Sequence, residues 1–344
     1  MPVTKPAACR RYVAALDTET GQTHNSPIMR LVCLAFLTVE FFLLPGPVVS
    51  GGPARASRAA AAVERPPIVG VAHIGLRTDD LQVARKFYHG VLGFDEPFTV
   101  DKPSGGLLLT YFKVNDHQYI EVFPELESAT EDRLSHISFE TTDAQRLRDY
   151  LASRGVKVPE ALEPGLDGNL SFNVTDPDGH VVEFVEYRAG SLHSRNFGKF
   201  LPDARISQRI IHVGVVVQDR AAADRFYRDT LGFHEMWHGG MTDTRTDWVD
   251  MRVPEGTDWL EYMLNVQNPS PRTLGVMHHL ALGVPSVEAG YKTVTSRGYK
   301  DGKPSIGRDG KWQFNLYDPN GTRAELMEPK PVRKPCCSPI EDVR

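Results

Sequence analysis

The sequence predicts an α+β fold made of two similar halves, each built from two units in which a strand and a helix precede further strands. Short runs that alternate apolar and polar residues indicate the strands, and apolar residues at helical spacing indicate the helices between them. A stretch of the first half also recurs, with many identities, 139 residues later. Such self-similarity is typical of a chain that repeats one structural unit.

The first unit shows the order of the elements. We expect a strand over residues 68–76, followed by a helix that begins after residues 79–80, two aspartates that can cap it, and ends at Gly93. Residues 107–114 and 118–123 are two further strand-like runs. The other three units follow the same plan, although the second and the fourth are shorter.

Units one and three match at a constant offset. The residues of unit one that recur 139 positions later, between His212 and Glu235, are His73, Gly75, Asp80, Ala84, Phe87, Tyr88, Leu92, Gly93, Phe94 and Glu96. Units two and four share a histidine at the start of a strand-like run and an Asp-Pro-x-Gly turn, at Asp176 and Asp318, before the last strand. The sequence therefore contains an internal duplication.

The duplication carries a set of histidines and glutamates at nearly equal intervals. These residues are His73, Glu121, His136 and Glu183 in the first half, and His212, Glu261, His279 and Glu325 in the second. Imidazole and carboxylate together form a ligand set for a divalent ion, and a buried carboxylate without a partner is costly. We therefore expect a divalent metal ion (Zn, Ni, Mn, Fe or Co) held by these residues. A single histidine in a strand would more often have a structural role, and we expect His278, next to His279, to be a surface or structural histidine.

The residues between 68 and 328 resemble the vicinal oxygen chelate superfamily, which includes glyoxalase I, methylmalonyl-CoA epimerase, fosfomycin and bleomycin resistance proteins and type I extradiol dioxygenases. The resemblance rests on the strand-start histidines, the Phe-Tyr…Leu-Gly-Phe helix endings, and the Asp-Pro-x-Gly turns before a glutamate strand. It implies four βαβββ modules, paired into two domains with curved mixed sheets, each around a metal-centred cup. The eight histidines and glutamates match the ligand positions of these modules.

The complete His/Glu/His/Glu set resembles that of glyoxalase-type lyases and isomerases. This implies a metal ion that acts as a Lewis acid on a small oxygenated substrate, and a glutamate that acts as the base. The catalytic candidates are Glu121, Glu183, Glu261 and Glu325. We expect the second half to be the active one, although the first could equally work. The polar residues that favour the second half are His234, His238, Arg245 and Arg308.

Two other functions stay open. An Fe(II) extradiol dioxygenase would use His212, His279 and Glu325, but the chain has no histidine between residues 280 and 344 to act as the acid–base group of ring cleavage. A non-catalytic protein that sequesters a ligand, as in bleomycin resistance, could line a cup with tryptophan. The four tryptophans are Trp237, Trp248, Trp259 and Trp312.

The composition of the chain limits the classes of partner that we expect. The net charge of -5 and the pI near 6.2 give no footprint for nucleic acid, so we expect a small-molecule substrate, with a homodimer left open. The cysteines are Cys9, Cys33, Cys336 and Cys337. They leave the folded body without a thiolate metal site, and we do not expect the adjacent Cys336 and Cys337 to bridge.

The ends of the chain are predicted to lie outside the fold. An apolar run at residues 31–44, preceded by Met29 and Arg30, indicates a signal peptide and hence a periplasmic or secreted protein, with a cytoplasmic one as the alternative. The run is too short to span a membrane, which takes about 20 residues. We expect the following division of the chain: a signal peptide and disordered segment at 1–67, domains at 68–188 and 207–328, a linker at 189–206, and a disordered tail at 329–344.

Overall fold

The computed structural model describes residues 63–341, which fall within one compact unit of the chain. The predicted signal peptide and the thiols of Cys9 and Cys33 lie outside the described residues. No helix within the described part is long and apolar enough to cross a membrane.

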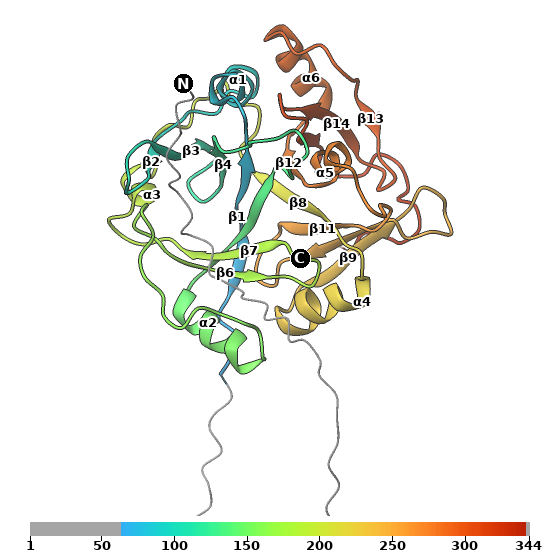
Figure 1. The fold of residues 1–344 in the computed structure, drawn as a ribbon. Helices are drawn as coiled ribbons and strands as arrows, with labels where there is room; N and C mark the ends of the chain where they lie inside the picture. The colour runs from blue at the N-terminus through green and yellow to red at the C-terminus, as the bar shows by residue number, and fades with distance from the viewer. Residues whose placement is uncertain (1–62, 342–344) are drawn as a thin grey trace, which may run out of the picture. The chain divides into compact units, whose positions relative to one another are not determined.

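The first half forms a seven-stranded mixed sheet in the order β2-β3-β4-β1-β5-β7-β6 (Figure 1). Its elements are β1 (Ile68–Arg77), α1 (Leu81–Arg85), η1 (Lys86–Val91), β2 (Thr99–Asp101), β3 (Leu107–Lys113), β4 (Tyr119–Phe123), β5 (Leu134–Thr141), α2 (Ala144–Ser153), β6 (Leu170–Thr175) and β7 (Val181–Glu186). The short helix α3 (Leu192–Arg195) follows, within the stretch expected to be a linker.

The second half forms an eight-stranded sheet in the order β13-β14-β15-β12-β8-β11-β10-β9. Its elements are β8 (Ile210–Val216), α4 (Arg220–Ala223), η2 (Asp224–Thr230), β9 (His234–Gly239), β10 (Trp248–Arg252), β11 (Trp259–Met263), α5 (Pro271–Met277), β12 (His279–Gly283), α6 (Val287–Ser296), β13 (Ser305–Ile306), β14 (Trp312–Tyr317) and β15 (Arg323–Met327).

The same pairing builds both sheets. Strand β1 runs parallel to β4, the last strand of its own unit, and antiparallel to β5, the first strand of the next. In the second half, β8 has the same relation to β11 and β12. Each sheet therefore joins two units at its centre and curls into a mixed half-barrel, which confirms the predicted α+β class.

The helix that follows the first strand of each half shows why the duplicated residues recur. The Asp80 carboxylate accepts hydrogen bonds from the backbone of Gln82 and Val83 and so caps α1, which continues into the π-helical η1. The chain then turns at Gly93, whose φ of 80° is a conformation that favours glycine. Gly232 has the same role after η2, with φ of 82°.

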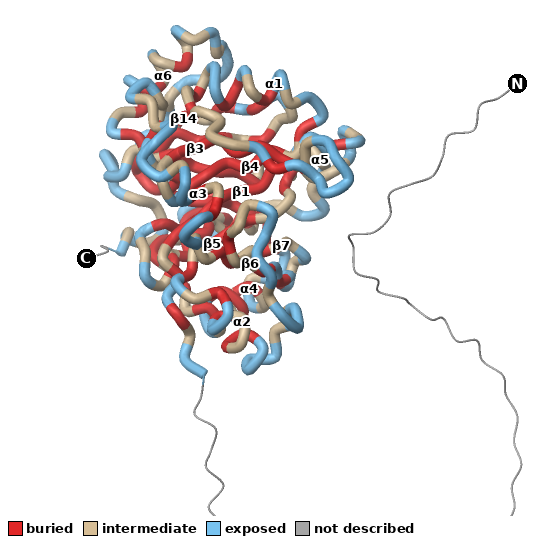
Figure 2. Tube along the Cα trace, turned by 90° about the vertical axis from the view of Figure 1, so that its left-hand side faces the viewer, coloured by how far each residue is buried: buried red, intermediate tan, exposed pale blue. Residues whose placement is uncertain are grey.

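One hydrophobic core serves both halves. Buried side chains of both sheets and of the helices form a single cluster, in which the Phe139 ring meets the Phe233 ring edge to face at 5.1 Å. Figure 2 shows the strands β1, β3 and β4 largely buried, with exposed segments around α5. The halves are thus packed together by apolar burial as well as by polar contacts.

The tail differs from its prediction. Residues 329–341, expected to be disordered, follow the second sheet: the amide of Glu341 bonds to Met236 O at 2.9 Å, and Ile340 packs on a small apolar cluster that includes Trp259. The Ser338 hydroxyl also bonds to the backbone of His238. The prolines and charges of the tail give no sign of these contacts, because bonds to the backbone have no sequence signature.

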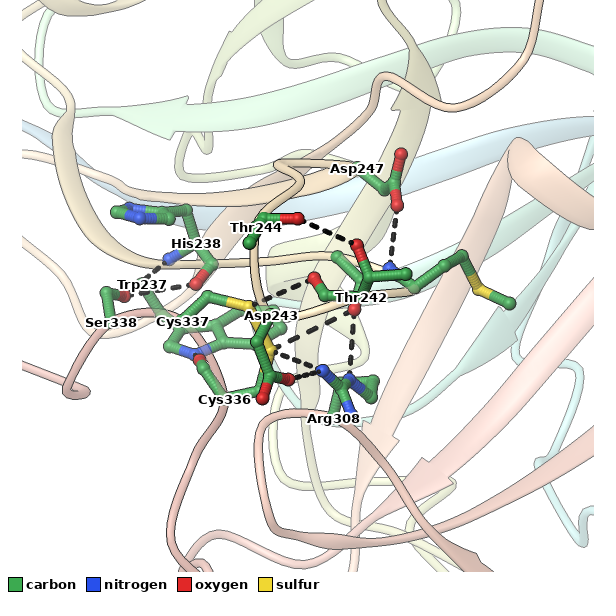
Figure 3. Close-up of a disulfide and its surroundings, with 12 residues drawn as sticks. Trp237, His238, Thr242, Asp243, Thr244, Asp247, Arg308, Cys336, Cys337 and Ser338 are labelled. Carbon is green, nitrogen blue, oxygen red and sulfur yellow. Dashed lines mark hydrogen bonds and ion pairs between the residues drawn. A yellow bond between two sulfur atoms is a disulfide. The ribbon is translucent and has the colours of Figure 1, made fainter.

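The prediction for the two neighbouring cysteines was also wrong. Cys336 and Cys337 form a disulfide within the tail (Figure 3). The surrounding chain holds this segment, since the Cys336 amide donates to Arg308 O at 2.8 Å and the Trp237 indole donates to Cys336 O at 3.2 Å. Neighbouring cysteines rarely have the geometry for a disulfide. The prediction did not take into account that contacts with the rest of the chain hold the backbone of this turn.

Candidate metal centres

Two adjacent rows of residues across the first sheet bring four side chains to one face. Along one row, Glu121 on β4 and His136 on β5 lie on either side of Gly75 on β1. In the second row, His73 on β1 and Glu183 on β7 lie on either side of Ser138 on β5. His73 is two residues before Gly75 on the same strand. Residues two apart on a strand share a face, so all four side chains lean over the small residues between them. We call this group the first cup.

Gly75 is required by this arrangement. A Cβ atom at this position would overlap the imidazole ring of His136, and Gly214 bears the same relation to His279 in the second half. Glycine therefore recurs in the duplication because the histidine ring lies directly over the neighbouring strand.

The ligand-type atoms of the first cup converge. His73 Nε2 lies 2.9 Å from His136 Nε2 and 2.7 Å from Glu183 Oε2. Glu121 lies 3.4 Å from each of the two imidazoles, through its two carboxylate oxygens. Donor atoms around a divalent ion with bonds of about 2.1 Å are separated by roughly 3.0–3.4 Å, so these spacings suit such an ion.

The electrostatics of the first cup also suit a cation. Within residues 63–341, neither Glu121 nor Glu183 forms an ion pair with a lysine or arginine, although both are largely buried. Burial acts to lower the pKa of His136, but hydrogen bonds and charge from the two glutamates outweigh it and raise the pKa to about 10. A metal ion at these atoms would compete with a proton on His136.

A cavity of about 200 Å³ opens beside the first cup. Its walls combine apolar groups such as Leu108 and Phe123 with the side chains of Tyr111 and Tyr187. His193 of α3 also lines it; its Nδ1 lies 2.7 Å from Asn169 Nδ2 and 3.3 Å from an Asp167 oxygen. His193 was not among the predicted site residues, because the stretch around α3 was expected to be a linker.

The second cup, made of His212, Glu261, His279 and Glu325, repeats the two-row arrangement, with Gly214 and Ala281 as the small residues. Its imidazoles again face each other, with 3.0 Å between the Nε2 atoms. Glu261 lies 3.1 Å from His279 Nε2, whereas Glu325 lies 3.9 Å from both imidazoles. The second cup is therefore looser than the first.

An arginine enters the second cup. Nη2 of Arg323 lies 2.7 Å from His279 Nε2 and 3.9 Å from Glu261 Oε2. Arg323 was not among the predicted site residues, although its position two residues before Glu325 on one strand places both on the same face.

Charged groups in the second cup titrate differently from those in the first. Burial lowers the pKa of His279 well below its usual range, and Arg323 adds to the effect. Burial likewise raises the pKa of Glu325 to about 8, against the opposing charge of Arg323. The lowered pKa values of His212 and His279 favour neutral imidazoles beside the Arg323 guanidinium.

The geometry of both cups agrees with a family assignment. The model of the Glyoxalase/Bleomycin resistance protein/Dioxygenase superfamily matches residues 70–184 and 209–326, which together exceed half of the chain. The chain belongs to this superfamily. The duplication seen in the sequence thus corresponds to two family domains, and the resemblance to vicinal oxygen chelate proteins is confirmed.

Curated members of the superfamily match parts of the chain. A lactoylglutathione lyase of Neisseria meningitidis serogroup B is 27% identical over 126 residues, which are 34% of this chain and 91% of that protein. Glyoxalase I of Saccharomyces cerevisiae is 27% identical over 97 residues, which are 28% of this chain and only 27% of the yeast protein. The match thus spans about a quarter of the yeast protein's length.

Solved structures share the fold over most of the chain. The homoprotocatechuate 2,3-dioxygenase of Arthrobacter globiformis superposes with a TM-score of 0.58 at 19% identity, covering 78% of this chain and 81% of that one. The Mn(II)-bound glyoxalase of Novosphingobium aromaticivorans also has a TM-score of 0.58, at 18% identity, covering 76% and 83%. At these identities the likeness concerns the fold.

The other polar residues that the sequence singled out in the second half take different places. Arg308 lines the cavity of about 220 Å³ beside the second cup, together with Trp237 and Trp248. His238 bonds to Glu235 at 2.7 Å, and Arg245 bonds to Asp247 at 2.6 Å. Neither lines that cavity.

The remaining tryptophans and histidines that the sequence singled out lie outside the lining of the second cavity. The ring of Trp259 packs against His212 at 4.9 Å, and Trp312 is partly exposed. His234 is exposed at the start of β9. His278 is buried and its Nδ1 lies 2.9 Å from an Asp132 oxygen, outside the second cup.

Proposed function

We propose that this chain is a divalent-metal-dependent lyase or isomerase of the glyoxalase type, with its reaction in the first cup. The single observation that carries the proposal is the convergence of two imidazoles and two carboxylates, at 2.7–3.5 Å, beside an open cavity. This choice departs from our preference for the second half, because only the first cup gathers its four donors without a nearby arginine.

His73, Glu121, His136 and Glu183 would hold the ion, which could be Zn, Ni, Mn, Fe or Co. When bound, the ion polarises a carbonyl or enol oxygen as a Lewis acid. A carbon-bound proton next to that oxygen becomes acidic enough for a carboxylate to remove.

Glu183 is the candidate base. Its side chain is 16% exposed toward the cavity, compared with 6% for Glu121. In the proposed step, a Glu183 oxygen takes the proton from the substrate carbon and returns it to a neighbouring atom. That carboxylate lies 2.7 Å from His73 Nε2, the atom that would face the ion, so the base is next to the polarised oxygen of the substrate. A lyase or isomerase needs no more than this transfer from its protein groups.

The cavity supports a small substrate. A volume of about 200 Å³, with apolar walls and two tyrosines, suits a compact molecule whose carbonyl or hydroxyl oxygens face the cup. The lactoylglutathione lyases that match the chain make an α-oxo thiol adduct one member of the substrate class to test.

A dioxygenase reaction receives less support. In the second half, the three residues that would hold Fe(II) include His279, and the nitrogen it would offer is already bonded to Arg323. In the first half, Glu121 adds a fourth donor to the set of two histidines and one glutamate. A purely sequestering protein would not require the carboxylates to converge.

The test is exchange of substrate hydrogen with solvent deuterium, followed by NMR. Protein freed of metal by a chelator is reloaded separately with Zn, Ni, Mn, Fe or Co and mixed with small α-hydroxy carbonyl compounds and an α-oxo thiol adduct. We expect exchange that depends on the ion and that falls by about 10²–10⁴-fold in Glu183→Gln, with a smaller fall in Glu121→Gln at saturating metal.

Other outcomes separate the alternatives. Oxygen uptake with 3,4-dihydroxyphenylacetate and Fe(II), without deuterium exchange, would support the dioxygenase. Loss of exchange in Glu325→Gln, with Glu183→Gln unaffected, would move the chemistry to the second cup. Ligand binding without either reaction would support sequestration.

A further inference from the structure

The second cup contains a cation that belongs to the protein itself. Arg323 begins β15 and points into the cup from the same face as Glu325. Its guanidinium lies 2.7 Å from His279 Nε2, and 3.9 Å from one oxygen of Glu261 and one of Glu325. Arginine stays protonated at any pH that proteins tolerate. The second cup is therefore occupied by a permanent positive charge.

The contact with His279 uses the atom that a metal would need. Nδ1 of His279 lies 2.8 Å from the carbonyl oxygen of Met277, so Nδ1 carries the ring hydrogen and Nε2 presents its lone pair. Nη2 of Arg323 donates to that lone pair. A metal ion and the guanidinium cannot share it, so binding of an ion requires Arg323 to leave.

The first cup offers a matched comparison. The same 142 residues separate Asp176 from Asp318, Glu183 from Glu325, and Val181 from Arg323. Valine donates no hydrogen bond and carries no charge. Correspondingly, the His136 side chain is 12% exposed and lines its cavity, whereas His279 is fully buried and does not line the cavity beside the second cup.

Further charged groups surround the second cup. The acidic side chains Asp250 and Asp309 line the cavity of the second cup together with its two glutamates. Lys311, almost fully buried, lies 3.4 Å from Asp309 and supplies a second internal cation. In the first half the position of Lys311 is taken by the neutral Asn169. The second half thus has two basic side chains, Arg323 and Lys311, at positions where the first half has a valine and an asparagine.

We propose that Arg323 takes the place of a divalent ion in the second cup, so that each chain binds one divalent ion tightly, in the first cup. The inference rests on the proposed function for the identity of the first site. It adds that the duplicated site is held together by an internal cation and is closed to metal at concentrations that fill the first cup.

Equilibrium dialysis against Zn(II) or Mn(II), followed by elemental analysis, tests this on the full chain after chelator treatment. Wild-type protein should retain one ion per chain. Arg323→Val, which installs the residue of the first cup, should retain two. Val181→Arg, the reverse change, should retain none. Arg323→Met keeps the length of the side chain without its charge and serves where Arg323→Val does not fold, as judged by circular dichroism.

Each result decides the question. Two ions of similar affinity in wild-type protein, one ion in both folded Arg323 variants, or an ion kept by Val181→Arg would overturn the inference. Within the wild-type background, Glu183→Gln should weaken the bound ion at least tenfold, and Glu325→Gln should leave its affinity unchanged. Wild-type protein without an ion, together with Arg323→Val that binds one, would contradict the proposed function and still support the role of Arg323.

Discussion

The hydroxyl of Tyr88 donates a hydrogen bond of 2.9 Å to Oδ2 of Asp318. Tyr88 belongs to the helix of the first unit and Asp318 to the Asp-Pro turn of the fourth, so the bond joins the two halves. Tyr227 donates to Asp176 at the same distance, with the halves exchanged. The duplication has therefore produced a reciprocal pair of buried polar contacts between the halves.

Removing the Tyr88 hydroxyl should destabilise the fold. In Tyr88→Phe, the buried Asp318 carboxyl loses one partner, which typically costs about 1–3 kcal/mol. Tyr227→Phe should cost less, because His180 still lies 2.9 Å from Oδ2 of Asp176. Urea unfolding of both variants measures the difference, and equal or negligible losses would contradict it.

The stability of the fold should depend on pH through Asp318. Burial raises the pKa of Asp318 to about 6 against opposing hydrogen bonds from Thr322 and Tyr88. A carboxyl whose pKa is higher in the folded state stabilises the fold fully below its unfolded pKa, near 4, and loses this contribution as the pH rises through the folded pKa. The unfolding free energy of wild type minus that of Asp318→Asn should therefore fall by about 2–3 kcal/mol between pH 4 and 7.

The counterpart Asp176 gives a control of opposite sign. Burial acts to raise its pKa, but the hydrogen bond and charge of His180 outweigh burial and lower the pKa. Its contribution is present above the unfolded pKa and is lost as the pH falls through the folded one. The wild-type minus Asp176→Asn difference should thus shrink below about pH 4. Both series are measured with a chelator, so that metal binding does not contribute.

Gly75→Ala should abolish tight metal binding. The added methyl group would overlap the imidazole of His136 and push it away from the other three donors. We expect at least a tenfold loss of metal affinity, which is the scale on which misplaced ligands act. Gly214→Ala makes the same change beside His279 and should leave the affinity of the bound ion as in wild type. Isothermal titration with Zn(II) measures both, and unchanged affinity in Gly75→Ala would count against the first cup.

Metal should stabilise the folded chain. An ion that binds only the folded state adds about 2.7 kcal/mol when its free concentration is 100 times its Kd, or roughly 5–10 °C in Tm. Differential scanning calorimetry with and without Mn(II) checks this. Glu183→Gln should show a much smaller shift at the same metal concentration, and an equal shift would place the ion elsewhere.

The positions of the candidate donors could be predicted because they depend on short-range rules. Alternation along a strand places His73 and Gly75 on one face, and the 139-residue repeat transfers that assignment to His212 and Gly214. The tail could not be predicted in this way. Its contact through Ile340 depends on an apolar cluster whose residues come from several strands, so no local sequence pattern predicts it.

The sequence by itself determined the duplication, the α+β class and the residues that converge in each cup, because periodicity and offset are properties of the chain alone. Only the tertiary structure decided that the two cups differ. Whether Arg323 reaches His279 depends on how β15 lies beside β12, and that depends on the packing of both halves around one core. The reciprocal tyrosine bonds have the same origin, since each joins residues more than 50 positions apart.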